Sequence, residues 1–403
     1  MKSLLALVVS SKAKAASALW TFPSILVAAL VIAWGAESAQ FLVSQGFVLA
    51  IISWLQTSPE FVVEGLIAWR QDVTLMTANF TGATRLLIGF GIPTVFLTAY
   101  LFNLKRKHAG RHLKSIKLRP ENSVPVLGLF VPIAYAIFIV LKASLHIGDA
   151  LALILIYAAY LYVIRKIPPT ETETLDEMEP VPRYILTRSK KVRNLLILGC
   201  FLFGGLVIFL VAEPFLESML ALATVLGFSE YFFVQWVAPF LSEFPEFISA
   251  SYWARTVKKA PMGLMNTVSS IIAELTLLVA LIPIVYSISR GAFKHFGFRT
   301  LFDLSVIPFD HLHQIEILLT AIAALLAFTL LLKMEIFWYE AIGLFGLWFY
   351  QFAVPSSREE IIIVYGFWIV IELVRGVVDR NRFKVWTTFR ELAGKHIFKR
   401  QTA

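Results

Sequence analysis

The sequence is poor in cysteine and in charged residues. Cys200 is the single cysteine, which excludes an internal disulfide and a cysteine-based metal cluster. Charged residues make up only 16% of the 403 residues, whereas hydrophobic residues make up 58%. A chain with so little polar surface cannot cover a water-soluble globule of this size. We therefore expect lipid to surround most of it.

Long polar intervals are also missing, since the longest runs only from about Lys166 to Arg193. This leaves no room for a large soluble catalytic domain. The sequence has no His-Glu-x-x-His motif and no convincing Ser/His pair, so we expect no enzyme and no cofactor. The formal net charge is +9, but the basic residues lie beside hydrophobic segments, which excludes a nucleic-acid partner as the explanation.

Long hydrophobic runs are what the sequence has instead. A helix crosses the hydrocarbon core of a bilayer with about 20 apolar residues. The runs predict an all-α polytopic membrane protein with about 10 to 11 transmembrane helices. We expect spans near 17–36, 38–68, 73–102, 124–143, 149–165, 194–226, 230–254, 263–289, 311–332 and 335–354, and a weaker eleventh near 359–378 that either spans or lies at the interface. We favour a span.

Basic residues give the expected orientation. The stretch from Lys105 to Arg119 contains no acidic residue and joins the third and fourth spans, which places it on the cytoplasmic side. Counting back predicts an N-terminus outside, in a protein integral to the plasma (inner) membrane. The predicted parts are a first five-helix repeat (1–165), a cytoplasmic linker (166–193), a second five-helix repeat (194–358) and an extra helix with a basic tail (359–403).

A self-match supports the two repeats. Gln56-Thr57-Ser58-Pro59-Glu60-Phe61 in the second span resembles Ser242-Glu243-Phe244-Pro245-Glu246-Phe247 in the seventh, and Asn79 in the third span corresponds to Asn266 in the eighth. Copies that are five spans apart insert in opposite orientations, because an odd number of crossings inverts the topology. The sequence therefore predicts two inverted repeats.

The matched segments have the chemistry of a cation site. A proline inside a span frees backbone carbonyls near mid-membrane, Glu60 and Glu246 add charge, and hydroxyl groups supply hard oxygen ligands. The simpler interpretation is a kink whose carboxylate reaches the interface. Burial of Glu60, Glu243, Glu246 and Glu274 would cost on the order of 10 kcal/mol if nothing compensated it, and packing alone does not justify that.

These residues resemble the sodium/calcium exchanger family of the cation/calcium antiporter superfamily, as a divergent member. Its two repeats each carry Gly-Thr-Ser-x-Pro-Glu followed by Gly-Asn-x-x-Gly-Ser-Asn-x-x-Asn/Asp. The resemblance implies that Glu60 and Glu246 are the paired ion-binding glutamates, and that spans one and six slide across a fixed site. The ion-binding residues so predicted are Gln56, Thr57, Glu60, Asn79, Ser242, Glu243, Glu246, Asn266, Ser270 and Glu274.

The chain departs from the family pattern at several positions. Glu243 stands where the family has a hydroxyl ligand, and Ala83 and Leu87 replace a serine and an asparagine. Arg85 lies within the third span, where a buried guanidinium needs a carboxylate partner. We predict that Arg85 pairs with Glu60, Glu64, Glu243, Glu246 or Glu274 in at least one conformation and modulates the ion site. Alternatively, Arg85 lines a water-filled cavity or reaches the interface.

The predicted function is exchange of calcium, or a related cation, for sodium or protons by alternating access. Clustered carboxylates disfavour joint ionisation, which makes protons more plausible, but the residues do not choose between the two ions. A second hypothesis is a transport-inactive or sensing protein in which Arg85 is a permanent internal cation. The expected partners are the lipid bilayer and inorganic cations, and the sequence makes no prediction of oligomeric state.

Overall fold

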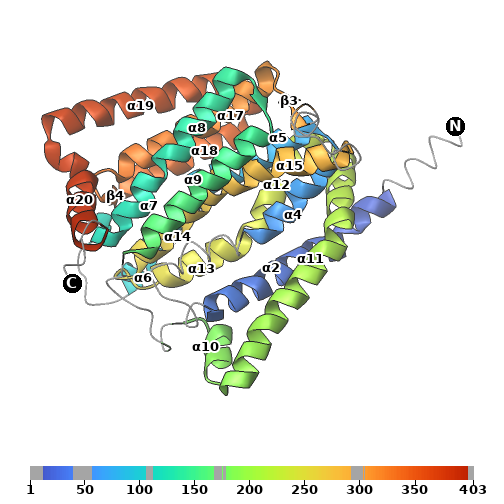
Figure 1. Ribbon diagram of the computed structural model, residues 1–403, viewed down its shortest axis with the longest axis horizontal. Coiled ribbons are helices and arrows are strands. Elements are labelled where there is room, and N and C mark those ends of the chain that lie inside the picture. Colours follow the sequence, from blue (N-terminus) through green and yellow to red (C-terminus); the bar gives the residue numbers. More distant parts are fainter. Residues whose placement is uncertain are drawn as a thin grey trace, which may run out of the picture.

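The computed structural model describes residues 12–39, 57–105, 112–167, 175, 178–291, 303 and 305–397, and it is an all-α membrane fold (Figure 1). In the element labels, α marks an α-helix and β1 to β4 are short strands. The labels η3 and η6 mark π-helical turns, and η4, η8 and η9 mark 3-10 turns. The first elements are α2 (Ala18–Ala39), α4 (Ser58–Trp69), α5 (Val73–Leu86), η3 (Leu87–Gly91), α6 (Ile92–Lys105), β1 (Ser115–Lys117), η4 (Pro120–Asn122), α7 (Ser123–Gly128), α8 (Phe130–Lys142), β2 (Ser144–Leu145) and α9 (Ile147–Arg165).

The remaining elements continue the bundle and end in a short helix on one side of it (Figure 1). They are α10 (Pro180–Leu186), α11 (Lys190–Leu226), α12 (Glu230–Ser242), α13 (Phe244–Ala254), α14 (Ala260–Ala273), η6 (Glu274–Leu278), α15 (Val279–Ser289), β3 (Ile307–Pro308), α17 (His311–Leu331), β4 (Glu335–Phe337), α18 (Trp338–Ala353), η8 (Pro355–Ser357), α19 (Arg358–Val378), η9 (Arg380–Phe383) and α20 (Lys384–His396).

Helices long and apolar enough to cross a bilayer make up most of the fold. Among the described residues there are 8: Lys12–Ala39, Val73–Lys105, Pro120–Lys142, Ile147–Arg165, Lys190–Leu226, Ala260–Ser289, His311–Leu331 and Pro355–Val378. The last of these agrees in length and composition with a spanning eleventh helix. The predicted spans at 230–254 and 335–354 are not continuous, because Glu243 separates α12 from α13 and because 335–337 form β4. Of the predicted span at 38–68, residues 40–56 lie outside the described ranges.

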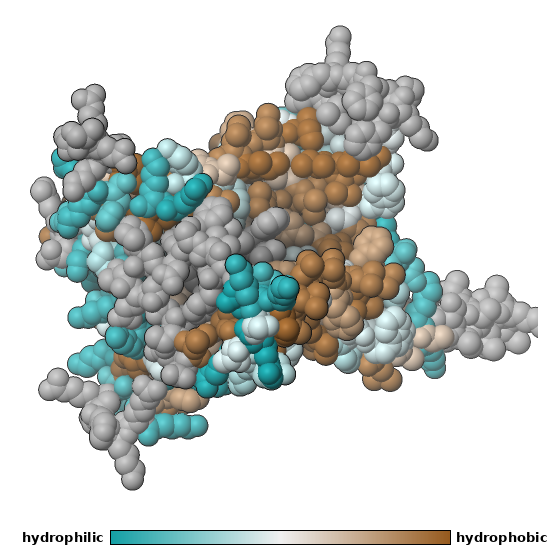
Figure 2. Space-filling model, turned by 60° about the horizontal axis from the view of Figure 1, so that its bottom comes forward, coloured by the Kyte–Doolittle hydropathy of each residue, from teal (hydrophilic) through white to brown (hydrophobic). Residues whose placement is uncertain are grey.

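The outer surface is suited to lipid. Large side chains such as Leu141 and Phe209 are 81% and 75% exposed, which is unfavourable in water but not against acyl chains. Figure 2 shows apolar side chains over the upper and middle part of one face, and hydrophilic side chains mainly along its left side with a smaller group near the centre. This pattern is typical of a protein whose middle lies in the hydrocarbon core.

Two short strand pairs reveal the internal symmetry. β1 pairs with β4, placing Ile116 opposite Ile336, and β2 pairs with β3, placing Leu145 opposite Ile307. β1 precedes α7 and α8 as β3 precedes α17, and β2 follows α8 as β4 follows α17. Exchanging the halves therefore converts one pair into the other. The π-helical turns agree, since η3 follows α5 and η6 follows α14.

Two helices lie along each other at one side of the bundle. Figure 1 shows α2 and α11 running side by side, and the two are in extensive contact. Small residues let them approach closely, since a Cβ added at Gly204 would lie 2.8 Å from the carbonyl oxygen of Ala28. Thr21 of α2 and Ser218 of α11 also share a buried hydrogen bond of 2.8 Å. These helices correspond to the first and sixth predicted spans.

Candidate cation site

Each Pro-Glu segment begins a new helix at the centre of the bundle. Pro59 lies in the first turn of α4 and Pro245 in the first turn of α13, positions where a proline costs no intrahelical hydrogen bond. The carbonyls of Thr57 and Glu243 accept hydrogen bonds from the backbone N–H groups of Glu60 and Phe247. A proline frees the carbonyl four residues earlier, which is that of Leu241 for Pro245 and lies outside the described residues for Pro59. The helix starts place Glu60 and Glu246 at helix N-termini, where the helix dipole favours negative charge.

Glu60 is held by residues from both repeats. It is fully buried, and its two carboxylate oxygens accept hydrogen bonds from the Asn79 amide of α5 and the Ser242 hydroxyl of α12. The same Asn79 amide nitrogen donates to Oε2 of Glu64 at 2.8 Å. Asn79 therefore bridges two glutamates that are one turn apart on α4. The predicted residues Glu60, Glu64, Asn79 and Ser242 lie together.

A second group of carboxylates lies beside the first. Glu243, Glu246 and Glu274 are 0 to 1% exposed, and none of their carboxylate oxygens has a hydrogen-bond partner in the described part of the chain. Glu243 interacts electrostatically with Glu60, Glu246 and Glu274, so it lies at the centre of the cluster. Ser270 is also buried, and its hydroxyl lies beside the carboxylate of Glu246. The carboxylate oxygens are available to bind a cation or to carry protons.

No basic side chain balances this group. Within the described ranges, none of Glu60, Glu64, Glu243, Glu246 and Glu274 forms an ion pair with a lysine or arginine. In the same ranges, no three His, Cys, Asp or Glu side chains are arranged to hold one metal ion. A cation here would take hydroxyl and amide oxygens beside one or two carboxylates, the mixed oxygen set that suits calcium or sodium.

Two of the other predicted ligands lie inside the bundle, and one lies outside the described residues. Thr57 and Asn266 are both fully buried, in the α4 N-cap and in α14. Gln56 lies outside the described residues. The carboxyl group of Glu274 interacts with Thr84 of α5, which brings η6 against the same helix that carries Asn79.

Arg85 does not pair with any of the predicted carboxylates. Its Nη2 lies 2.5 Å from Oε2 of Glu316 in α17, and both side chains are buried. Arg358 of α19 contacts the other oxygen of Glu316. In this conformation the predicted partners do not pair with Arg85, and Glu316, 231 residues away, supplies the charge instead. The sequence offered one signal, an acidic residue in an otherwise apolar span, which marks a candidate partner for an intramembrane arginine.

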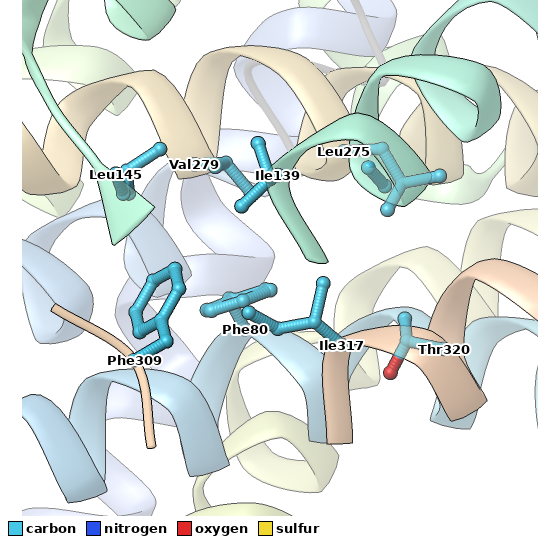
Figure 3. Close-up of a pocket in the computed structure, with 9 residues that line it drawn as sticks. Phe80, Ile139, Leu145, Leu275, Val279, Phe309, Ile317 and Thr320 are labelled. Atoms are coloured by element: carbon cyan, nitrogen blue, oxygen red, sulfur yellow. The ribbon is translucent and has the colours of Figure 1, made fainter. Parts of the chain in front are cut away.

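A separate small cavity lies beside the cluster but is not the cation site. Figure 3 shows Phe80, Leu275, Ile317 and Phe309 turned towards it, with Thr320 at one end. The cavity holds about 10 Å³, and no charged residue lines it. Apolar side chains cannot replace the hydration shell of a cation, so this cavity reflects packing between α5, α8, α15 and α17.

Known proteins share the family and the fold of this chain. The sequence matches the family model "Sodium/calcium exchanger protein" over residues 3–166 and 196–354. A crystal structure of the H+/Ca2+ exchanger CAX is 32% identical, with a TM-score of 0.81 over 97% of this chain and 94% of that chain. No curated protein matches the sequence.

Two structures of the sodium-calcium exchanger NCX_Mj share the fold. Both are 17% identical and cover 86% of this chain and 99% of theirs, with TM-scores of 0.53 and 0.54. One was soaked with Na+ and no Ca2+, and the other with Na+ and Sr2+. The two matched halves, the Pro-Glu repeat and the strand symmetry agree, and the chain is an integral membrane protein that belongs to the sodium/calcium exchanger protein family.

Proposed function

We propose that the protein is a secondary active antiporter that exchanges Ca2+ for protons by alternating access. The observation that carries the proposal is the buried group of carboxylates without a basic partner in the described chain. Burial of uncompensated negative charge is strongly unfavourable. The group is stable only when cations or protons occupy it, and alternate occupancy by the two is what an exchanger requires.

Protons are favoured over sodium as the exchanged ion for two reasons. Glu243 adds a carboxylate where the family pattern has a hydroxyl, and it lies next to three other carboxylates. Closely spaced carboxylates bind protons and a divalent cation in competition, because the divalent cation needs the charges that protons neutralise. The relative that is 32% identical is an H+/Ca2+ exchanger.

The residues divide between the two repeats in this account. Glu60, Asn79 and Thr57 supply oxygen ligands from the first repeat, while Ser242 and Glu246 supply them from the second. Glu243 and Glu274 take up protons when calcium leaves. We expect the α2–α11 pair to slide across this group and to open it to each side in turn, with the N-terminus outside in the plasma membrane.

The transport-inactive alternative depended on Arg85 as a permanent internal cation. The pairing of Arg85 with Glu316 leaves the carboxylate group without that cation. No structural observation therefore favours the alternative.

Calcium flux tests the proposal. Purified protein in proteoliposomes loaded at low internal pH should take up calcium when the outside is alkaline, in sodium-free buffer. The matched control is Glu360→Gln, which changes a surface glutamate and should leave uptake unchanged. Absence of calcium uptake under the pH gradient, or uptake that occurs only with a sodium gradient, would refute the proposed function.

A further inference from the structure

A buried charged network lies on the side of α5 away from the carboxylate group. Arg85 is 2% exposed; its Nη1 donates to Oε1 of Gln351 at 3.3 Å, and its Nε donates to the carbonyl of Thr81 at 3.1 Å. The guanidinium also lies 5.2 Å from the centre of the Trp236 ring. Glu316 is fully buried and accepts hydrogen bonds from Arg85, Arg358 and Gln235.

This network joins helices from both repeats and the additional helix. Arg85 belongs to α5, Gln235 to α12 and Glu316 to α17. Gln351 of α18 donates in turn to the hydroxyl of Tyr365 in α19 at 2.8 Å. The carboxylate of Glu316 on α17 is the common acceptor for donors from α5, α12 and α19, and α18 joins the network through the bond between Gln351 and Arg85.

The same point is where α5 and α12 cross most closely. A Cβ added at Gly82 would lie 1.8 Å from the carbonyl oxygen of Gln235, so the two backbones are in direct contact there. Gln235 therefore contacts α5 through its backbone and Glu316 through its amide. The crossing has no room to shift unless the Glu316 network also rearranges.

Residues that hold Glu60 lie on these two helices, a short distance from the crossing. Asn79 is less than two turns before Arg85 on α5, and Ser242 is about two turns after Gln235 on α12. Both donate to the carboxylate of Glu60. A rotation or shift of either helix at the crossing would move its Glu60 ligand by a comparable amount.

We propose that Arg85 and Glu316 are positioning residues of the exchange, which fix the α5–α12 crossing and thereby the geometry of the cation ligands. This inference rests on the proposed function. Arg358 extends the same role to α19, which lies outside the two matched family segments. The arginine binds no transported ion and acts through Asn79 and Ser242.

The network predicts which variants remain folded. In Arg85→Gln, Glu316 keeps Arg358 and Gln235 as donors, so its charge is still compensated. In Glu316→Gln, two arginines face each other without an anion, which should be the more damaging change. In the double variant Arg85→Gln/Glu316→Gln, the remaining Arg358 side chain is 23% exposed and donates to the carbonyl of Pro355.

The test measures the dependence of uptake rate on calcium concentration in proteoliposomes. We expect Arg85→Gln to raise the KM for calcium about 10-fold or more, because small displacements of ligands weaken binding strongly, with a smaller change in the maximal rate. Arg85→Lys should not restore the KM, since an ammonium group cannot reach Glu316, Gln351 and Thr81 together. The double neutral variant should recover much of the affinity.

Two controls separate positioning from general stability. Arg70→Gln removes an exposed arginine that pairs with Glu213 and should leave the KM unchanged. If Arg85→Gln lowers only the yield of folded protein and leaves the KM of the remainder unchanged, the inference is overturned. If the KM of Arg85→Gln is unchanged and Glu246→Gln abolishes uptake, the inference about Arg85 is overturned but the exchange function is not. Undiminished uptake in Glu246→Gln removes Glu246 from the proposed site instead.

Discussion

The hydroxyl of Ser242 donates a hydrogen bond to the carboxylate of Glu60, although 182 residues separate them in the sequence. Ser242 ends α12 in the second repeat, and Glu60 lies in the first turn of α4 in the first repeat. The contact joins the two Pro-Glu segments at one buried point. It is the most direct structural evidence that the repeats build a single site.

Loss of this contact should weaken cation binding. In Ser242→Ala, Glu60 loses a donor that fixes its orientation, and a hydrogen bond to a charged group contributes about 1.5–3 kcal/mol. We expect calcium affinity to fall about 10-fold, measured by isothermal titration calorimetry on purified protein. Ser24→Ala is the matched control, because the Ser24 hydroxyl donates to the backbone carbonyl of Trp20 in its own helix. The calcium affinity of this control variant should equal that of the wild type. Equal affinity in Ser242→Ala would show that this hydroxyl does not organise the site.

Removal of one central charge should stop transport. Glu246→Gln keeps the size and hydrogen-bonding capacity of the side chain but removes a charge that a divalent cation requires. We expect calcium uptake to be lost while the variant inserts and elutes as a folded protein in size-exclusion chromatography. Calcium uptake at the wild-type rate would remove Glu246 from the site.

The crossing of α5 and α12 should tolerate no added methyl group. Gly82→Ala places a Cβ 1.8 Å from the Gln235 carbonyl oxygen, so the helices must separate, and overpacking typically costs about 1–3 kcal/mol. Gly205→Ala in α11 meets no atom within 4 Å and should stabilise the helix by about 0.5–1 kcal/mol. Thermal unfolding in detergent should therefore shift down for Gly82→Ala and not for Gly205→Ala. Equal unfolding temperatures would contradict the close crossing.

The contribution of Glu179 to the stability of the folded protein should depend on pH. Burial raises the pKa of Glu179 above its usual value of 4.5, opposed by the Trp34 hydrogen bond at 3.0 Å and by Arg255. The folded state therefore binds this proton more readily than the unfolded state, so its stabilising effect is full below pH 4.5 and declines as pH rises through the raised pKa. Glu179→Gln should be more thermostable than the wild type at pH 7, with the difference vanishing near pH 4. A pH-independent difference would assign the effect to another group.

Part of the arrangement around Glu60 and Glu246 follows from the sequence. The Pro-Glu self-match predicted that the two glutamates occupy equivalent positions in the two repeats, but it placed them inside continuous spans, whereas each lies in the first turn of a helix. The break between α12 and α13 was missed, since a hydrophobic run of that length is also typical of a continuous helix. Likewise, Ile336 and Phe337 are apolar enough to join a span, but 335–337 pair with β1 instead.

The charge partner of Arg85 could not be derived from local pattern. Glu64 is one turn from Glu60 and was a reasonable candidate on helix spacing, yet Asn79 holds it. Glu316 meets Arg85 because α17 packs against α5, and although an acidic residue in an apolar span marks a candidate partner, nothing in either segment predicts that the two helices are neighbours. The consequence for function is large, because the pairing leaves the carboxylate group without a basic partner among the residues that the structure describes.

Proton countertransport is the central claim, and simultaneous recording of calcium and pH inside proteoliposomes tests it most directly. In sodium-free buffer, with the membrane potential clamped by potassium and valinomycin, addition of external calcium should raise internal calcium and internal pH together, because protons leave as calcium enters. The Glu246→Gln variant should show neither change. Calcium entry without an internal pH change, or entry that requires a sodium gradient, would contradict the account.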